Sequence, residues 1–147
     1  MRLLLFTIDE NRYGIVADAV VEIVRAVAIT PLPNAPAVIA GVIDVRGVVM
    51  PVFDVRRRFG LAAREVELSD HFVVVRAKRR SAVLHVDRVL DLADVDDDAL
   101  SSLAGQVPSS PYVAGVVTLA DGLAVIHDVD TFLSRAEEES LDAALSA

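Results

Sequence analysis

The sequence predicts an all-β protein made of two small antiparallel barrels, with short helical turns and one C-terminal helix. The first observation is a series of about ten short apolar runs bounded by turn residues, which is the pattern of strands joined by tight connections. The second is composition: hydrophobic residues make up 54% of the chain and aromatic residues only 5%, so an aliphatic, valine-rich core is expected, and valine favours strands. The third is an internal repeat.

The repeat matches two segments of the first half of the chain to two segments of the second half. A shift of 74 positions places Ile39–Ile43 (IAGVI) over Val113–Val117 (VAGVV). A shift of 69 positions places Asp18–Ile23 over Asp87–Leu92. Two similar units are the simplest explanation, with a longer connector in the second unit to account for the different offsets.

From the repeat we expect a single domain over residues 1–147 that contains two subdomains. The expected bounds are about 1–64 for subdomain 1, about 65–134 for subdomain 2 and about 135–147 for the C-terminal helix. A barrel of about 60 residues buries little apolar surface by itself, so the two barrels should share an apolar seam with a surface groove beside it.

The first third of the chain predicts a hairpin, a turn with a strand, and a connector. Leu3–Ile8 and Tyr13–Val16 are apolar runs around a polar turn and predict two paired strands. In Asp18–Val27 the apolar spacing fits both a helix and a strand, and we expect one turn followed by a strand. Three prolines in Thr30–Pro36 predict an extended connector, because proline cannot donate the hydrogen bonds of a sheet.

The rest of the chain is organised around the segment Val38–Gly60. It predicts two apolar strands folded about Gly47, which can take the positive φ that hairpin turns require. Asp44 and Arg46 are then charged side chains beside the bend, where we expect the surface chemistry. A short helical turn after Asp54 should end at Gly60 in a left-handed cap.

The second half of the chain predicts similar elements. The polar segment Arg64–Asp70 is the expected boundary between the subdomains, and Ser134 with Glu137 predicts a capping box that opens the last helix. The remaining predicted elements are hairpin strands at 72–76 and 81–86, a strand at 89–95, a helical turn after 96–98, a loop at 101–111, hairpin strands at 112–119 and 123–127 around Asp121 and Gly122, and a helix face of Leu141, Ala144 and Leu145.

Composition excludes several classes of function. Without cysteine, thiolate catalysis and cysteine-ligated zinc are excluded. A formal net charge of −8 argues against a nucleic-acid partner, because nucleic-acid affinity depends on a concentrated basic face. No apolar stretch approaches the roughly 18 to 20 residues of a membrane span, and the first apolar run is too short for a signal peptide. We expect a cytoplasmic protein without metal, cofactor, nucleic-acid partner or direct membrane insertion.

The histidines raise an enzyme hypothesis, which the details oppose. Each lies within two residues of an aspartate: Asp70 with His71, His85 with Asp87, and His127 with Asp128. A histidine oriented by a carboxylate is a familiar general base. Adjacent strand residues point to opposite faces, however, and the shift of 74 places His127 over Phe53, which suggests a packing role. Motifs of common nucleophiles and phosphate loops are absent, so we expect no catalytic residue.

Two basic clusters are expected to be solvated. Arg56–Arg58 are consecutive on a predicted helical turn, so their side chains point in different directions. Lys78–Arg80 occupy the tip of a predicted hairpin. The acidic run Asp96–Asp98 lacks the spaced oxygens and glycine turn of a calcium loop and is expected to begin a helical turn.

Four segments carry a resemblance to a known family. They are Ile29–Pro36 (ITPLPNAP), Gly41–Gly60 (GVIDVRGVVMPVFDVRRRFG), His85–Val89 (HVDRV) and Asp128–Ser134 (DVDTFLS). In order and spacing they resemble the CheW-like family of chemotaxis adaptors, over nearly the whole chain. The resemblance implies paired five-stranded SH3-like barrels without catalytic activity. It also implies two partners, the cytoplasmic tip of methyl-accepting chemoreceptors and the regulatory domain of the chemotaxis histidine kinase, for an adaptor of the free-standing type.

The same resemblance implies a partner surface. The family's Asn-Leu-Arg-Gly turn falls on residues 44–47, which carries the receptor-contacting role to Arg46. Asp44 replaces the usual asparagine and raises the alternative that Arg46 is held in a local ion pair. The family's Val-x-Glu-Ile segment falls on residues 20–23. The expected partner-binding residues are therefore Val20, Glu22, Asp44, Arg46 and Gly47.

Two other functions stay open from the sequence. One is a CheW-like regulatory adaptor of a non-flagellar pathway, such as twitching, surface sensing or gene regulation. The other is a small-molecule-binding or catalytic barrel, which a deep closed pocket lined by histidine and aspartate would favour.

Overall fold

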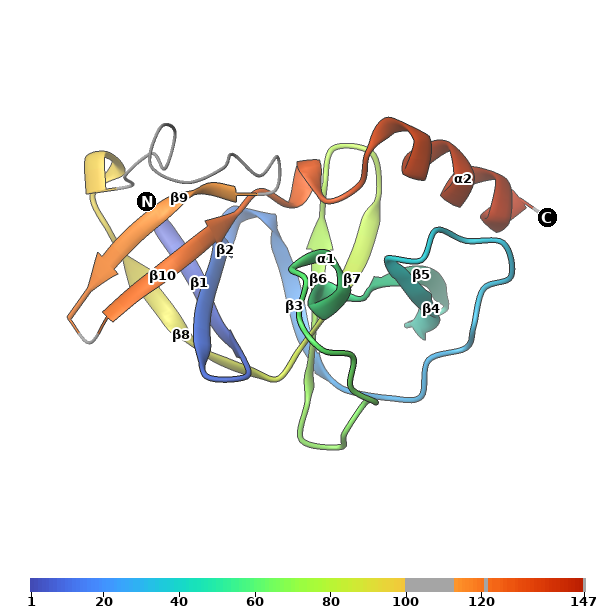
Figure 1. Ribbon diagram of the computed structural model, residues 1–147, viewed down its shortest axis with the longest axis horizontal. Coiled ribbons are helices and arrows are strands. Elements are labelled where there is room, and N and C mark those ends of the chain that lie inside the picture. The colour runs from blue at the N-terminus through green and yellow to red at the C-terminus, as the bar shows by residue number, and fades with distance from the viewer. Residues whose placement is uncertain (100–112, 121, 147) are drawn as a thin grey trace.

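The computed structural model describes residues 1–99, 113–120 and 122–146, and these form two five-stranded barrels side by side, followed by a C-terminal helix (Figure 1). The predicted all-β fold class is confirmed. The predicted loop at 101–111, Tyr112 and Asp121 lie outside the described residues. Within the described part of the chain, no helix is long and apolar enough to cross a membrane.

One barrel, here called the terminal barrel, combines strands from both ends of the chain. In sheet order these are β8 (Arg88–Asp94), β1 (Arg2–Ile8), β2 (Asn11–Val16), β10 (Gly122–His127) and β9 (Val113–Leu119). The other, the central barrel, is one continuous stretch of chain. In sheet order its strands are β3 (Val20–Arg25), β6 (His71–Arg76), β7 (Ser81–Val86), β5 (Val48–Phe53) and β4 (Ile39–Val45).

The helical elements connect or close the barrels. They are the 3₁₀ turns η1 (Ala17–Ala19), η2 (Asp97–Ala99) and η3 (Val129–Thr131), and the helices α1 (Val55–Arg58) and α2 (Arg135–Ser146). The predicted turn followed by a strand after Asp18 is confirmed by η1 and β3, and the predicted turn after the acidic run by η2.

The predicted subdomain boundary near residue 64 is wrong, although the repeat behind it is real. Strands β3, β4 and β5 hold the same places in the central sheet as β8, β9 and β10 hold in the terminal sheet. The central barrel is completed by the following hairpin β6–β7, whereas the terminal barrel takes the hairpin β1–β2 from the start of the chain. Aligning the chain with itself shows which strands are alike, but it does not show which hairpin pairs with those strands. The segment Arg64–Asp70 is therefore a loop within the central barrel.

Each barrel also contains one parallel strand pair, which differs from the antiparallel barrels expected. β2 pairs with β10, and β5 pairs with β7, in parallel. Every hairpin is antiparallel because a tight turn reverses the chain, whereas strands distant in sequence are free to pair in either direction.

An apolar seam joins the barrels, as predicted. One buried cluster contains Phe6 and Ile15 of the terminal barrel together with Leu84 and Val86 of the central barrel. Because apolar burial contributes about 25 cal/mol per Å², this seam holds the barrels together.

Aromatic rings fill the seam next to α1. His127 is 5% exposed and stacks on Phe59, with ring centroids 3.9 Å apart and planes at 14°. Phe132 packs edge-on against both rings. The packing role predicted for His127 is confirmed.

Helix α1 has the predicted left-handed cap at Gly60, and the structure adds an N-cap at Asp54. The Asp54 carboxylate accepts a hydrogen bond from the Arg57 backbone N–H at 3.1 Å, and Gly60 has φ +75° just past the helix end. The expectation that its arginines are solvated is wrong for two of the three. Arg56 is 6% exposed, and the Arg58 side chain is 10% exposed and lies 2.6 Å from the Glu137 carboxylate of α2.

The last helix begins with the predicted capping box. Ser134 Oγ accepts from the Glu137 N–H at 3.1 Å, and Glu137 Oε1 accepts from the Ser134 N–H at 2.8 Å. Leu141 and Ala144 are buried as expected. The predicted burial of Leu145 is wrong, since this residue is 39% exposed. The buried stripe of α2 is narrow and contains Leu141 and Ala144 but not Leu145.

The hairpin tip at Lys78–Arg80 is also less solvated than expected, because α2 packs across it. Arg80 lies 2.5 Å from the Glu138 carboxylate and 2.6 Å from the Asp142 carboxylate. Arg79 pairs with Asp142 at 3.2 Å. These pairs join a helix that follows the terminal barrel in sequence to a hairpin of the central barrel.

Candidate functional site

The turn between β4 and β5 has the geometry that the sequence predicted. Val45 and Val48 are paired, so Arg46 and Gly47 are the two central residues, with φ of +53° and +86°. Positive φ at both positions is typical of type I′ hairpin turns. Asp44 Oδ1 accepts a hydrogen bond from the Gly47 N–H at 2.7 Å and so caps the turn.

Arg46 is held in a strained position with its side chain in solvent. A non-glycine residue in the left-handed region costs about 1 to 2 kcal/mol. Its side chain is 80% exposed, and Nη1 lies 3.1 Å from Glu22 Oε2. The sequence raised the alternative of a local pair with Asp44. The structure pairs Arg46 with Glu22 instead, which brings together two of the predicted partner-binding residues from β3 and the β4–β5 turn.

A shallow groove of about 180 Å³ lies between β3 and β4, the two outer strands of the central sheet. Glu22 and Arg46 form its charged wall. The rest of the lining is Val24, Arg25, Val27, Ile43, Asp44 and Val45. The groove combines an apolar floor with an ion pair at its rim, which is the composition of a protein-docking surface rather than of a reaction centre.

The two predicted residues of β3 lie on the same face and are both partly buried. The side chain of Glu22 is 21% exposed, and Val20 packs against the buried cluster of the seam. The opposite face of β3 presents Val21, 60% exposed, and Ile23, 43% exposed. These two residues were missed from the sequence, although the period of two along a strand, starting from an inward Val20, is the signal that indicates them.

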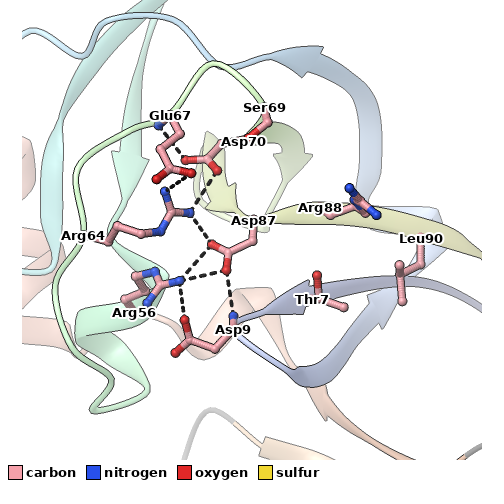
Figure 2. Close-up of a pocket in the computed structure, with 10 residues that line it drawn as sticks. All are labelled: Thr7, Asp9, Arg56, Arg64, Glu67, Ser69, Asp70, Asp87, Arg88 and Leu90. Atoms are coloured by element: carbon pink, nitrogen blue, oxygen red, sulfur yellow. Dashed lines mark hydrogen bonds and ion pairs between the residues drawn. The ribbon is translucent and has the colours of Figure 1, made fainter.

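A second cavity, of about 400 Å³, lies where the two barrels meet α1 (Figure 2). Its walls hold a cluster of ion pairs. Arg56 Nη2 lies 2.7 Å from Asp9 Oδ1 and 2.8 Å from Asp87 Oδ2. Arg64 Nη2 lies 2.5 Å from Asp87 Oδ1 and 2.9 Å from Asp70 Oδ1.

This cavity bears on the catalytic alternative because it is lined by aspartates and lies near a histidine. His85 Nε2 lies 2.7 Å from Asp70 Oδ2, and both side chains are buried. His85 is therefore paired with Asp70 and not with Asp87, the aspartate close to it in sequence. Asp70 and Asp87 each accept from arginine, so neither carboxylate is a free base poised for proton abstraction. In the described part of the chain, no group of three metal-ligating side chains is present.

Comparisons with known proteins identify the family and agree with the fold. The family model described as CheW-like domain matches residues 2–137. The chain belongs to the CheW-like domain family. Its non-catalytic scaffold character, predicted from the sequence, is confirmed by that membership together with the relatives below.

Two curated relatives of this CheW-like domain are named as chemotaxis proteins. The chain is 29% identical over 141 residues to "Chemotaxis protein CheW" of Rhizobium meliloti, covering 94% of this chain and 90% of the relative. It is 30% identical over 133 residues to "Chemotaxis protein CheW" of Helicobacter pylori, covering 88% and 79%. Among solved structures, the scaffolding protein TtCheW of Thermoanaerobacter tengcongensis superposes with a TM-score of 0.83 at 26% identity, over 92% of this chain and 94% of that one.

The ion-pair cluster of this CheW-like domain keeps two carboxylates charged. Burial opposes the charged form of Asp70, but hydrogen bonds from Arg64, the Glu67 N–H and His85 outweigh it and lower its pKa. Burial likewise opposes the charge of Asp87, and the Asp9 N–H, Arg64 and Arg56 together lower its pKa.

These lowered pKa values predict acid sensitivity. A carboxyl whose pKa is lowered on folding stabilises the protein fully above its unfolded pKa of about 3.9, and this contribution is lost as the pH falls through the folded value. We expect the thermal midpoint of the chain to fall steeply below about pH 4. Asp87→Asn should flatten that fall, whereas Asp18→Asn, at an exposed position, should leave it unchanged. Equal slopes in a pH series of melting curves for Asp87→Asn and the parent would contradict the assignment.

Proposed function

We propose that this CheW-like domain is a cytoplasmic adaptor that binds the cytoplasmic tip of a methyl-accepting chemoreceptor and the regulatory domain of a chemotaxis histidine kinase. In this role it transmits receptor occupancy to kinase activity without chemistry of its own. Relatives named as chemotaxis proteins over nearly the whole chain support the pathway. The observation that carries the site is the groove between β3 and β4, with the exposed Arg46 paired to Glu22 at its rim.

The receptor tip is assigned to this groove. A receptor tip is a helical hairpin, and an amphipathic helix docks by laying its apolar face into an apolar groove. The floor at Val24 and Ile43 suits such a face. Arg46 suits an acidic side chain of the helix because its planar guanidinium pairs with a carboxylate through two hydrogen bonds while its stem covers apolar surface.

The kinase is assigned to the terminal barrel, so that both partners can be bound together. Strand β8, an outer strand of the terminal sheet, presents Leu90 and Leu92, 43% and 50% exposed. These leucines lie on a different barrel from the groove. Two separate patches on one body allow a ternary complex, and coupling between sites then depends on the geometry that joins them.

The proposed function is tested by titrating the purified chain against two partners encoded in the same genome. They are the isolated regulatory domain of a histidine kinase and a soluble fragment of a chemoreceptor tip. We expect each to bind at about micromolar affinity, which corresponds to about 8 kcal/mol, and both to bind simultaneously. Failure to bind either partner would reject the proposal, and mutually exclusive binding would reject the two-patch arrangement.

A further inference from the structure

The ion-pair cluster in Figure 2 lies at the one-residue connection between the barrels. Strand β7 of the central barrel ends at Val86 and β8 of the terminal barrel begins at Arg88, so Asp87 is the single residue between these two strands, while η1 forms the other connection, from β2 to β3. A one-residue connection is a natural hinge, because the φ and ψ of that residue set the direction in which the next barrel continues.

The side chain of this connecting residue is tied to both barrels. On the terminal side, Asp87 Oδ2 accepts from the Asp9 backbone N–H at 2.7 Å, in the β1–β2 turn. On the central side, the same carboxylate accepts from Arg56 of α1 and from Arg64 of the following loop. Arg56 Nη2 also donates a hydrogen bond to Asp9 Oδ1, so the β1–β2 turn is bonded to both Arg56 and Asp87.

These contacts differ in kind from the apolar seam. Hydrogen bonds between charged partners are short and directional, and an arginine that holds two carboxylates fixes their relative positions. The Arg56 side chain is 7% exposed and that of Asp87 22% exposed, so water competes little for the bonds between them, whereas the Asp9 side chain is 50% exposed and is reached by water on its outer side. The apolar seam is closely packed but its contacts have no preferred direction, whereas the bonds of the cluster hold named atoms of the two barrels against one another.

We propose that the Asp9–Arg56–Asp87 cluster is an angle lock, which fixes the orientation of the terminal barrel relative to the central barrel. Its part in signalling rests on the proposed function: a fixed angle keeps the receptor groove and the kinase patch in one relative geometry. The apolar seam, and not the lock, holds the barrels together. Breaking the lock therefore loosens the angle and leaves the fold in place.

The test measures the angle directly in the free protein. The chain has no cysteine, so Thr118→Cys on β9 and Ala40→Cys on β4 place spin labels on exposed residues of opposite barrels. Asp87→Asn removes the negative charge that pairs with Arg56, and Asp9→Asn removes the charge at the other end of the same arginine, so each variant weakens the lock. The bond from the residue 9 backbone N–H is kept in both, and asparagine tolerates the positive φ of +56° at position 9. Glu10→Gln, an exposed residue of the same turn, is the control with equal charge change.

We expect a broadened and shifted distribution of label-to-label distances for both lock variants, and an unchanged distribution for Glu10→Gln. Near-ultraviolet circular dichroism confirms that each variant is folded, and Asp9→Asn keeps the test decisive if Asp87→Asn fails to fold. An unchanged distribution in a folded Asp9→Asn chain would overturn the lock and would leave the proposed function untouched.

A second measurement tests the link to signalling. Folded lock variants should bind the receptor fragment and the kinase regulatory domain singly with the affinity of the parent, yet lose receptor control of kinase activity in a mixture of the chain, the receptor and the full-length histidine kinase. Full control in a variant with a broadened distance distribution would overturn the signalling part of the proposal. Loss of binding to either single partner would overturn the claim that the lock acts through the angle alone.

Discussion

Arg46→Glu is expected to weaken binding of the receptor tip by about 30-fold or more, which corresponds to about 2 kcal/mol and is typical of a residue at the centre of an interface. The change removes the guanidinium from the groove rim and places a third carboxylate beside Glu22 and Asp44. Folding should be unaffected, because the Arg46 side chain is 80% exposed and the turn is capped by Asp44 and Gly47. The measurement is a titration of the receptor fragment monitored by calorimetry.

Two variants separate a direct contact from an indirect one. Arg76→Glu, at an exposed residue of β6 in the same barrel, makes the same charge change and should leave receptor affinity within about twofold. The charge swap Arg46→Glu with Glu22→Arg restores an ion pair at the rim but not the guanidinium at position 46. If Arg46 contacts the receptor, the swap stays weak. Restored affinity in the swap would show that only the pair with Glu22 matters.

The turn could be predicted from the sequence because its determinants are local. Gly47 supplies positive φ and the flanking valines supply the strands, so the position of Arg46 follows from a short stretch of chain. Its partner Glu22 could not be predicted in the same way, since the pair depends on how the two outer strands of the central sheet face each other. The family resemblance named both residues but not the bond between them.

The angle lock could not be predicted from the sequence either, because it too depends on residues that lie far apart in the chain. Asp9, Arg56 and Asp87 lie far apart in sequence, and Arg56 is predicted to be solvated because consecutive basic residues on a short helical turn usually are. The burial of Arg56 follows from the strand pairing, which places the β1–β2 turn against α1. A misplaced subdomain boundary and a missed ion-pair cluster therefore have one cause: both depend on long-range strand pairing.

The stability of the barrel pair should depend most on the ring of Phe132. This side chain is 1% exposed and packs against Phe53 of the central barrel, with centroids 5.8 Å apart, and against His127 of the terminal barrel, at 6.0 Å. Phe132→Ala removes the ring from both barrels at once. We expect a loss of about 3 to 5 kcal/mol in the free energy of unfolding, from lost transfer energy and the cavity that remains.

That loss is a large part of the free energy of unfolding of a domain of this size, which is about 5 to 15 kcal/mol. Phe132→Ala should therefore strongly lower the urea concentration at the unfolding midpoint, while the slope of the unfolding free energy against urea concentration stays unchanged. Leu68→Ala removes an apolar side chain that is 92% exposed and should stay within about 0.5 kcal/mol of the parent. A loss below about 1 kcal/mol for Phe132→Ala would mean that the seam collapses around the missing ring. If the seam joins the barrels and the lock sets their angle, the two kinds of variant must behave differently. Phe132→Ala has the larger effect on the urea midpoint, whereas Asp9→Asn has the larger effect on the width of the label-to-label distance distribution.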